Sequence, residues 1–289
     1  MPIGPFLLSL PRLYLLAAVM IAFGASALML RGEARAKSSA VLWTSIIIGA
    51  VAARIGYVLT HLQHYGENPI EIIRLWDGGL SPVFGIAATL IVAAWLSARR
   101  DAHPTRVIAS LLIGMGAWGL LHVIDQSMRD EHSPMLADVT LHALDGTPTE
   151  LRSFVGKPVV LNLWATWCPP CRREMPALSS AQTAHGNVHF VFANQNETAD
   201  DVREFTLAQR LELDNILLDR GTLADEYSAP GLPTTLFFDR NGRLQHVHIG
   251  ELSAPRLADY LSSFDVSEHD LVFEQRRIAV DTGFLRQRQ

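Results

Sequence analysis

Four long runs of apolar residues dominate the first 130 positions of the chain. They cover residues 13–30, 41–59, 80–98 and 107–124, and each is 18 or 19 residues long. An α-helix needs about 20 apolar residues to cross the hydrocarbon core of a bilayer, and helices of soluble proteins are seldom apolar on every side over this length. Three runs contain no charge and the second contains one, Arg54. The pattern predicts an α-helical membrane domain of about four spans over residues 1–130.

The basic residues between these runs predict how the spans are oriented. Arg31, Arg35 and Lys37 follow the first run, and Arg99, Arg100 and Arg106 follow the third. The second loop and the two flanks have one each, namely Arg74, Arg12 and Arg129. Because Lys and Arg gather on the cytoplasmic side, we expect the first and third loops inside and both termini outside.

The first run also admits a second interpretation, as a cleaved signal peptide. Ala25-Ser26-Ala27 lies near its end, as a cleavage site requires, but residues 1–11 contain three prolines and no basic residue. Cleavage would leave the basic first loop outside, against the charge rule.

The pattern changes after residues 125–136, a polar stretch that is typical of a linker. Strands are expected at 159–164, 188–193, 216–218, 235–238 and 244–249, and helices at 171–185, 198–211, 223–227 and 253–264. Asn241-Gly242 separates the last two strands and indicates a hairpin. The order predicts an α/β domain over residues 136–264, with a mixed sheet covered by helices on both faces. Residues 265–289 form an extension to which the sequence assigns no role.

Composition supports this division. Of the 289 residues 49% are hydrophobic and only 18% are charged, against about 25% charged in ordinary soluble proteins. Residues 1–134 carry a net charge of +2 (10 Lys and Arg, 8 Asp and Glu), and residues 135–289 carry −7 (14 against 21). The overall charge of −5 gives no reason to expect nucleic acid as a partner. The two cysteines exclude a disulfide-stapled fold and a four-cysteine zinc site.

The candidate chemistry lies in Cys168-Pro169-Pro170-Cys171, where an expected strand ends and a helix begins. The free N–H groups and positive dipole end of the helix stabilise a thiolate at Cys168, which is the attacking form of the thiol. Cys171 follows one turn later, close enough to form a redox-active disulfide, and no further cofactor is needed. Pro169 and Pro170 fit the first helical turn. We expect Trp167 to shield the sulfurs beside an exposed docking surface.

Two other interpretations of the cysteine pair are weaker. A zinc site needs two more ligands; His246 and His248 share a strand face, but an exposed hairpin explains them equally well. A purely structural disulfide closing a four-residue loop would stabilise the chain little. We therefore expect redox chemistry and no metal.

Residues 159–176, VVLNLWATWCPPCRREMP, resemble the thioredoxin superfamily and within it the membrane-anchored TlpA/ResA-like thiol-disulfide oxidoreductases. The resemblance extends over residues 136–264. It implies a cis-proline opposite the cysteines, for which Pro233 in Gly231-Leu232-Pro233-Thr234-Thr235 is the candidate. It also implies that the backbone of Leu232 pairs with an incoming client and that Pro233 packs against the disulfide.

The same resemblance indicates which groups handle protons. Many thioredoxins have a buried aspartate where this chain has Asn162, and TlpA/ResA-like members have a glutamate where it has Glu174. A carboxylate there can take the proton from Cys171. The alternative is an exposed glutamate that the helix dipole favours. Glu197 lies near another acid of the family, or is a helix cap.

A second resemblance concerns the membrane domain. Residues 53–57 (ARIGY), 67–69 (ENP) and 76–81 (WDGGLS) are similar to prolipoprotein diacylglyceryl transferases. Those enzymes carry a histidine after the serine that matches Ser81, whereas this chain continues with Pro82. Residues 67–81 are amphipathic and are expected at the outer interface with Trp76 at headgroup depth. Arg54 and His122 are ionisable residues within spans, and Arg54 is a candidate lipid-facing residue, although snorkelling explains it as well.

These observations favour a thiol-disulfide oxidoreductase in the bacterial inner membrane, with its catalytic domain in the periplasm. Cys168 attacks, Cys171 resolves and Glu174 moves the proton. The TlpA/ResA resemblance implies a reductase of client disulfides, in cytochrome c maturation among other roles. Because the spans contain no cysteine, a separate membrane electron donor of the DsbD/CcdA type is expected. The alternatives are a lipid-modifying or lipid-binding module with an accessory thioredoxin-like domain, and a non-catalytic partner-binding module.

Overall fold

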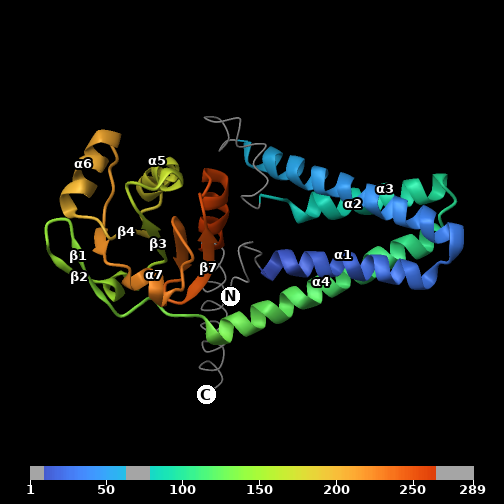
Figure 1. Cartoon of the computed structure of the whole chain (residues 1–289), viewed down its shortest axis with the longest axis horizontal. Helices are drawn as coiled ribbons and strands as arrows, with labels where there is room; N and C mark the ends of the chain where they lie inside the picture. The colour runs from blue at the N-terminus through green and yellow to red at the C-terminus, as the bar shows by residue number, and fades with distance from the viewer. Residues whose placement is uncertain (1–9, 63–78, 265–289) are drawn as a thin grey trace, which may run out of the picture. The chain divides into compact units, whose positions relative to one another are not determined.

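The computed structural model describes residues 10–62 and 79–264 (Figure 1). The chain divides into two compact units, Met1–His132 and Ser133–Gln289, each of which is described by itself. The predictions for residues 67–78, including Trp76, and for the extension 265–289 lie outside the described residues.

The first unit is made of apolar helices. They are α1 (Leu10–Met29), α2 (Gly32–Thr60), α3 (Pro82–Arg99) and α4 (Pro104–His132). Of the helices described, α2, α3 and residues 104–125 of α4 are long and apolar enough to cross a membrane, while the apolar part of α1, Leu13–Met29, is shorter. The helices pack in two pairs, α1 with α4 and α2 with α3.

Two segments expected outside helices are helical. Residues 125–132, interpreted as a linker, continue α4. They lack apolar periodicity, but Gln, Met, Arg and Glu are good helix formers, and the helix ends just before Ser133-Pro134. Arg35 and Lys37, expected in the first loop, lie in the first turns of α2, where Lys37 pairs with Glu33 at 3.1 Å.

Small residues let α2 and α3 approach closely. A Cβ atom added at Gly49 of α2 would clash with Thr89 Oγ1 and would lie 2.9 Å from the Gly85 carbonyl oxygen of α3. Close packing through small residues is how helices associate in membranes, where the hydrophobic effect does not drive them together.

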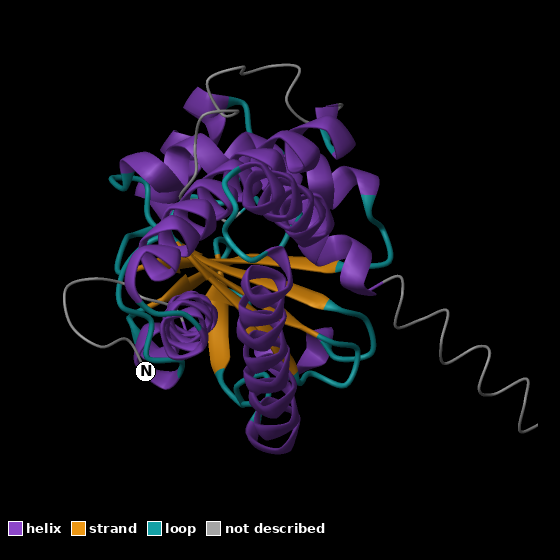
Figure 2. Ribbon diagram, turned by 90° about the vertical axis from the view of Figure 1, so that its right-hand side faces the viewer, coloured by secondary structure: helices purple, strands orange, loops and turns teal. Residues whose placement is uncertain are grey.

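The second unit is built on a seven-stranded mixed sheet with the order β2-β1-β5-β4-β3-β6-β7 (Figure 2). Its strands are β1 (Thr140–Ala143), β2 (Pro148–Glu150), β3 (Val159–Trp164), β4 (His189–Gln195), β5 (Ile216–Asp219), β6 (Thr234–Phe238) and β7 (Leu244–Ile249). Strands β3, β4 and β5 are parallel, and β6 and β7 form the predicted hairpin. The helices are α5 (Pro169–Ala184), α6 (Ala199–Gln209), α7 (Thr222–Glu226) and a closing helix at residues 254–264.

The sequence interpretation missed β1 and β2, together with the 3₁₀ helix Leu151–Phe154 that follows them. Both strands are short and have little apolar alternation. The missed signal is Asp145-Gly146 between them: Gly146 has φ +85°, and the Asp145 carboxylate accepts from the N–H of Thr147 at 2.9 Å. Such a pair marks a tight hairpin turn.

Alternation along β3 divides the core of this unit in two. Val160 and Trp164 face the cluster that contains both cysteines, α5 and the closing helix. Val159, Leu161 and Leu163 face the opposite cluster, with Leu223 of α7. Since strand side chains alternate, Asn162 lies on the face of the cysteines, between Val160 and Trp164. One polar residue is thus inserted into an otherwise apolar face, directly beneath the start of α5.

Candidate active site

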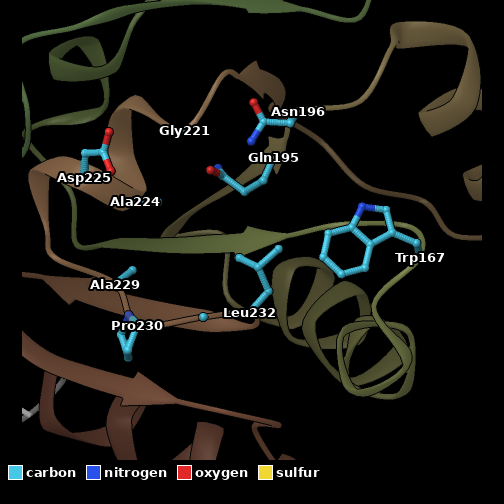
Figure 3. Close-up of a pocket in the computed structure, with 10 residues that line it drawn as sticks. Trp167, Gln195, Asn196, Gly221, Ala224, Asp225, Ala229, Pro230 and Leu232 are labelled. Atoms are coloured by element: carbon cyan, nitrogen blue, oxygen red, sulfur yellow. The ribbon is translucent and has the colours of Figure 1, made fainter. Parts of the chain in front are cut away.

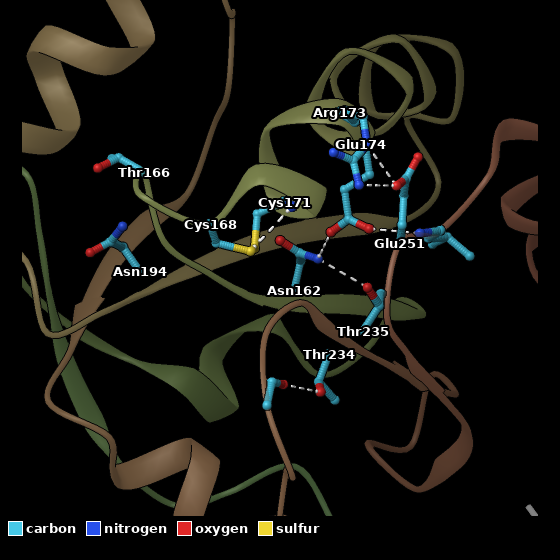
Figure 4. The surroundings of a disulfide bond; sticks show 12 residues. Asn162, Thr166, Cys168, Cys171, Arg173, Glu174, Asn194, Thr234, Thr235 and Glu251 are labelled. Atoms are coloured by element: carbon cyan, nitrogen blue, oxygen red, sulfur yellow. Dashed lines mark hydrogen bonds and ion pairs between the residues drawn. A yellow bond between two sulfur atoms is a disulfide. The ribbon is translucent and has the colours of Figure 1, made fainter. Parts of the chain in front are cut away.

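Cys168 and Cys171 form a disulfide at the N-terminus of α5, with their Cα atoms 5.3 Å apart (Figure 4). Cys168 is the N-cap residue, and its sulfur accepts a hydrogen bond from the N–H of Cys171 at 3.2 Å. Pro169 and Pro170 occupy the first helical positions, where no backbone donor is lost. Cys171 has no exposed surface, while Cys168 keeps 3%. A thiol can therefore reach the pair only at Cys168.

Glu174 lies one turn after Cys171 and is buried, with 1% of its surface exposed. The alternative of an exposed, dipole-favoured glutamate is therefore wrong. Its Oε1 accepts from Asn162 Nδ2 and its Oε2 from the N–H of Leu252, both at 2.8 Å. Burial raises the pKa of Glu174 to about 8, although the hydrogen bonds from Leu252 and Asn162 oppose this rise, and Glu251 adds to it.

Asn162 connects the Glu174 carboxylate to Thr235 on the neighbouring strand β6. Its Nδ2 donates both to Glu174 and to Thr235 Oγ1 at 2.9 Å. The two acceptors fix the orientation of the amide, so Oδ1 points away from them, on the side of the disulfide (Figure 4). This buried oxygen has no hydrogen-bond partner among the described residues.

Glu197 anchors the loop that precedes Cys168. Its carboxylate accepts from the Thr166 N–H at 2.7 Å, from the Thr166 hydroxyl, and from Asn194 Nδ2 at 2.7 Å. It is not a helix cap: Thr198 is the N-cap of α6, in a capping box with Asp201. Three hydrogen bonds from two segments hold the loop in one position, which fixes Trp167 and Cys168 relative to the sheet.

A groove opens at Trp167, the residue that precedes Cys168 (Figure 3). The Leu232–Pro233 peptide bond is cis, as the thioredoxin resemblance predicts. Leu232 and Trp167 line one end of the groove, and the other end is formed by Ala224 and Asp225 of α7. Trp167 is 67% exposed, so it offers its ring to a partner.

The comparisons with known proteins agree with this geometry. Residues 134–247 match the model of the AhpC/TSA family, and residues 4–121 match that of prolipoprotein diacylglyceryl transferase. The thioredoxin-like protein YneN of Bacillus subtilis is 30% identical over 162 residues, which are 54% of this chain and 94% of that protein. The chain belongs to the thioredoxin-like thiol-disulfide oxidoreductases.

Other members of this family are similar over the same unit. The thiol-disulfide oxidoreductase ResA of Halalkalibacterium halodurans is 33% identical over 124 residues, covering 42% of this chain and 70% of the relative. The crystal structure of StoA from Bacillus subtilis aligns at 26% identity over 44% of this chain and 98% of that one, with a TM-score of 0.38. The similarity to the ResA sequence identifies the Cys168–Cys171 disulfide as the redox-active pair of a ResA-type oxidoreductase. In this chain it is fused to apolar helices.

No group of three or more metal-ligating side chains occurs among the described residues. The rings of His246 and His248 contact Tyr260 instead, with centroids 5.2 and 6.0 Å away. The two histidines of the zinc interpretation are therefore occupied in packing the hairpin against the closing helix.

Arg54 lies in α2 of the helical unit, where the sequence left its role open. Its side chain is buried rather than lipid-facing or snorkelling, and Nη1 donates to the Gly79 carbonyl oxygen at 2.8 Å. A guanidinium is costly in hydrocarbon unless it is paired, so it turns into the helical unit. His122 of α4 stacks on Trp118, with centroids 5.6 Å apart.

Several residues of the site were not found from the sequence. Thr235 follows the cis-proline by two positions, which is a usable signal. Glu251 and Leu252 lie in the connection after β7 and carry no motif. Glu251 pairs with Arg173 at 2.6 Å, and the N–H of the next residue, Leu252, binds Glu174.

Proposed function

We propose that this protein is a membrane-anchored oxidoreductase that reduces client disulfides in the periplasm. The observation that carries the proposal is the disulfide at the start of α5, open only at Cys168, with the buried carboxyl of Glu174 one turn behind Cys171. The proposed docking residues are Trp167, Pro169 and Pro170 of the cysteine motif, and Leu232 and Pro233 of the cis-proline loop.

The catalytic cycle uses these groups in order. The Cys168 thiolate attacks a client disulfide, one client sulfur leaves as a thiolate, and a mixed disulfide forms. The Cys171 thiol then passes its proton to the Glu174 carboxylate and attacks Cys168 Sγ, which releases the second client thiolate and forms the Cys168–Cys171 disulfide. Two electrons pass from the protein to the client.

The return step uses the same carboxyl in reverse. A dithiol donor attacks Cys168 Sγ, and Cys171 leaves as a thiolate. With a pKa of about 8, Glu174 is mostly protonated at neutral pH and can give its proton to this leaving group. The second thiolate of the donor then attacks the mixed disulfide and frees Cys168. We propose that the donor is a separate membrane protein of the DsbD/CcdA type, because residues 1–134 contain no cysteine.

The distribution of charge supports a periplasmic position for the catalytic unit. The α1–α2 and α3–α4 connections lie at one end of the helical unit, since Arg106 Nη1 donates to the Met29 carbonyl at 3.4 Å and Ser38 Oγ to that of Ala102 at 3.3 Å. All six basic residues of the predicted first and third loops lie at or near these connections. The positive-inside rule assigns this end to the cytoplasm, and the end of α4 to the other side.

A trapping experiment tests the proposal. The Cys171→Ser variant lacks the resolving thiol, so its Cys168 should remain covalently bound to clients in native membranes, in adducts that dithiothreitol releases. The Cys168→Ser/Cys171→Ser double variant is the matched control and should form none. If the single variant yields no reductant-sensitive adduct, the protein does not act on client disulfides.

A second candidate function rests on the helical unit. The match to the transferase model and the buried Arg54 favour a lipid-modifying or lipid-binding module. Comparing strains that carry Arg54→Ala or Cys168→Ser separates the two functions. Loss of the phenotype with Arg54→Ala, but not with Cys168→Ser, would favour the lipid function.

A further inference from the structure

The groove at Trp167 has the size of a single side-chain site. Its volume is about 320 Å³, at the lower end of the range of roughly 300–1,000 Å³ for small-ligand pockets. One end lies at Trp167, next to Cys168, and the other at Asp225 (Figure 3). This inference rests on the proposed function, because a client cysteine joined to Cys168 brings its neighbouring residues into the groove.

The lining of the groove carries negative charge without a balancing cation. Asp225 is exposed, and its carboxylate has no hydrogen bond or ion pair with any residue that the structure describes. No Lys, Arg or His occurs among the described residues that line the groove. The unit as a whole is acidic, with a net charge of −7 over residues 135–289.

Gln195 helps to hold the wall of the groove in one position. Its side chain is 4% exposed, and its Nε2 donates to the Ala193 carbonyl at 3.1 Å and to Asp219 Oδ2 at 2.9 Å. These two acceptors fix the amide, which leaves Oε1 buried without a hydrogen bond in the described structure. Asp219 also accepts from the N–H groups of Thr222 and Leu223, so the whole arrangement is held by the start of α7.

Trp167 lies at the other end of the groove from Asp225. An exposed indole ring attracts a cation over its face, and most of the Trp167 side chain is left uncovered by the residues that the structure describes. The carboxylate of Asp225 and the aromatic ring of Trp167 both favour a cation over an anion.

We propose that this groove binds a lysine or arginine side chain of the client, close in sequence to the cysteine that Cys168 attacks. The cationic group pairs with the Asp225 carboxylate, and the client segment that carries it extends toward the exposed ring of Trp167. An acidic side chain would be repelled by Asp225, and an apolar one would leave this carboxylate without a counter-charge. The groove thus selects basic client segments.

Peptide mixed disulfides test this specificity. Each peptide carries one cysteine linked to a chromophoric thiol, and lysine, alanine or glutamate is placed in turn at each flanking position. The reduced full-length protein in detergent is mixed with each peptide, and release of the chromophore gives the rate constant of attack. Each rate constant is divided by the one measured when glutathione attacks the same peptide, because a nearby lysine also changes the intrinsic reactivity of the disulfide.

We expect one flanking position at which lysine reacts about five- to tenfold faster than alanine, and glutamate more slowly, as for one exposed ion pair with an aromatic contact. Added salt should reduce the preference. Asp225→Lys should abolish it, whereas Glu226→Lys, the same charge change on the neighbouring residue outside the groove, should retain most of it.

Two results would overturn the inference. One is equal corrected rates for all peptides, and the other is equal loss of preference in the Asp225→Lys and Glu226→Lys variants, which would assign it to the overall charge. Failure of the proposed function is distinguishable, because then no peptide would react with the reduced protein.

Discussion

Replacing Glu174 by glutamine tests the proton transfer on which the proposed cycle depends. With a pKa of about 8, roughly one Glu174 carboxyl in ten is ionised at pH 7. If the ionised form takes the proton of Cys171, the resolving step should become about tenfold faster above pH 7 and level off just above pH 8. In Glu174→Gln only the spontaneously ionised Cys171 thiol can attack. The step should be about 100-fold slower at pH 7, at the lower end of general-base effects.

The pH at which the rate of the resolving step levels off, seen as a bend in its pH profile, distinguishes the wild type from the Glu174→Gln variant. A thiol ordinarily ionises near pH 8.5, so the rate of the variant should continue to rise where that of the wild type is already constant. Rapid mixing of the reduced full-length protein with a disulfide-bonded peptide, followed by acid quenching, measures the mixed disulfide as it forms and decays. Glu204→Gln, an exposed site on α6, is the matched control.

A second variant keeps the test independent of folding. Glu251 raises the pKa of Glu174 through its charge, so Glu251→Gln should move the bend to lower pH with Glu174 still present. The reasoning is refuted if Glu174→Gln bends at the same pH as the wild type, because the bend would then belong to another group. It is also refuted if Glu251→Gln leaves the bend in place.

Three further predictions follow from the same contacts. Between pH 4.5 and about 8 the folded protein keeps a proton on Glu174 that the unfolded chain has lost. The free energy of unfolding of the oxidised protein should therefore fall by about 1.4 kcal/mol per pH unit. Denaturant titrations of Glu174→Gln should lack this contribution, and an equal pH dependence of the unfolding free energy in both proteins would contradict the prediction. Glu197→Ala leaves the donors of Thr166 and Asn194 unpaired and should lower the free energy of unfolding by about 2–3 kcal/mol. Thr198→Ala, which removes the α6 cap, should lower it by about 1 kcal/mol. Equal decreases of the two variants in urea unfolding would show that the hydrogen bonds of Glu197 do not stabilise the loop. Arg54→Ala should lower the melting temperature of the helical unit in detergent and leave peptide reduction unchanged, and a parallel loss of reductase activity would disprove their independence.

The local features of the site were predictable because they depend on neighbouring residues. A buried apolar strand, an abrupt Cys-Pro-Pro-Cys and a helical pattern suffice to place Cys168 at a helix N-terminus. The α6 capping start at Thr198 and the Asn241-Gly242 hairpin are local in the same sense, and both are confirmed. The short strands β1 and β2 were missed because their few residues carry little periodic signal.

The protonation of Glu174 was not predictable, since its cause lies far away in the chain. Spacing alone places Glu174 one turn after Cys171, where it is equally consistent with an exposed surface residue. The residues that act on its carboxyl group include Leu252, which donates a hydrogen bond, and Glu251, whose charge raises its pKa. They are 78 and 77 positions away and have no recognisable motif. Likewise, the amide of Asn162 is oriented by Thr235 on another strand. Long-range contacts of this kind decide whether a carboxyl group is a spectator or a proton carrier.

The accessibility of the two sulfurs constrains how the protein exchanges electrons. Cys171 has no exposed surface and Cys168 has 3%, so both the client and the electron donor must attack or be attacked at Cys168. They therefore compete for one face, beside Trp167 and Leu232, and cannot be bound to the sulfur together. Because the chain contains no third cysteine, it has no internal thiol relay that would separate the two exchanges. The kinetics should be ping-pong, with each partner inhibiting the other competitively. A donor that shares this face meets the same groove as the client, so its docking segment is expected to carry a basic residue as well.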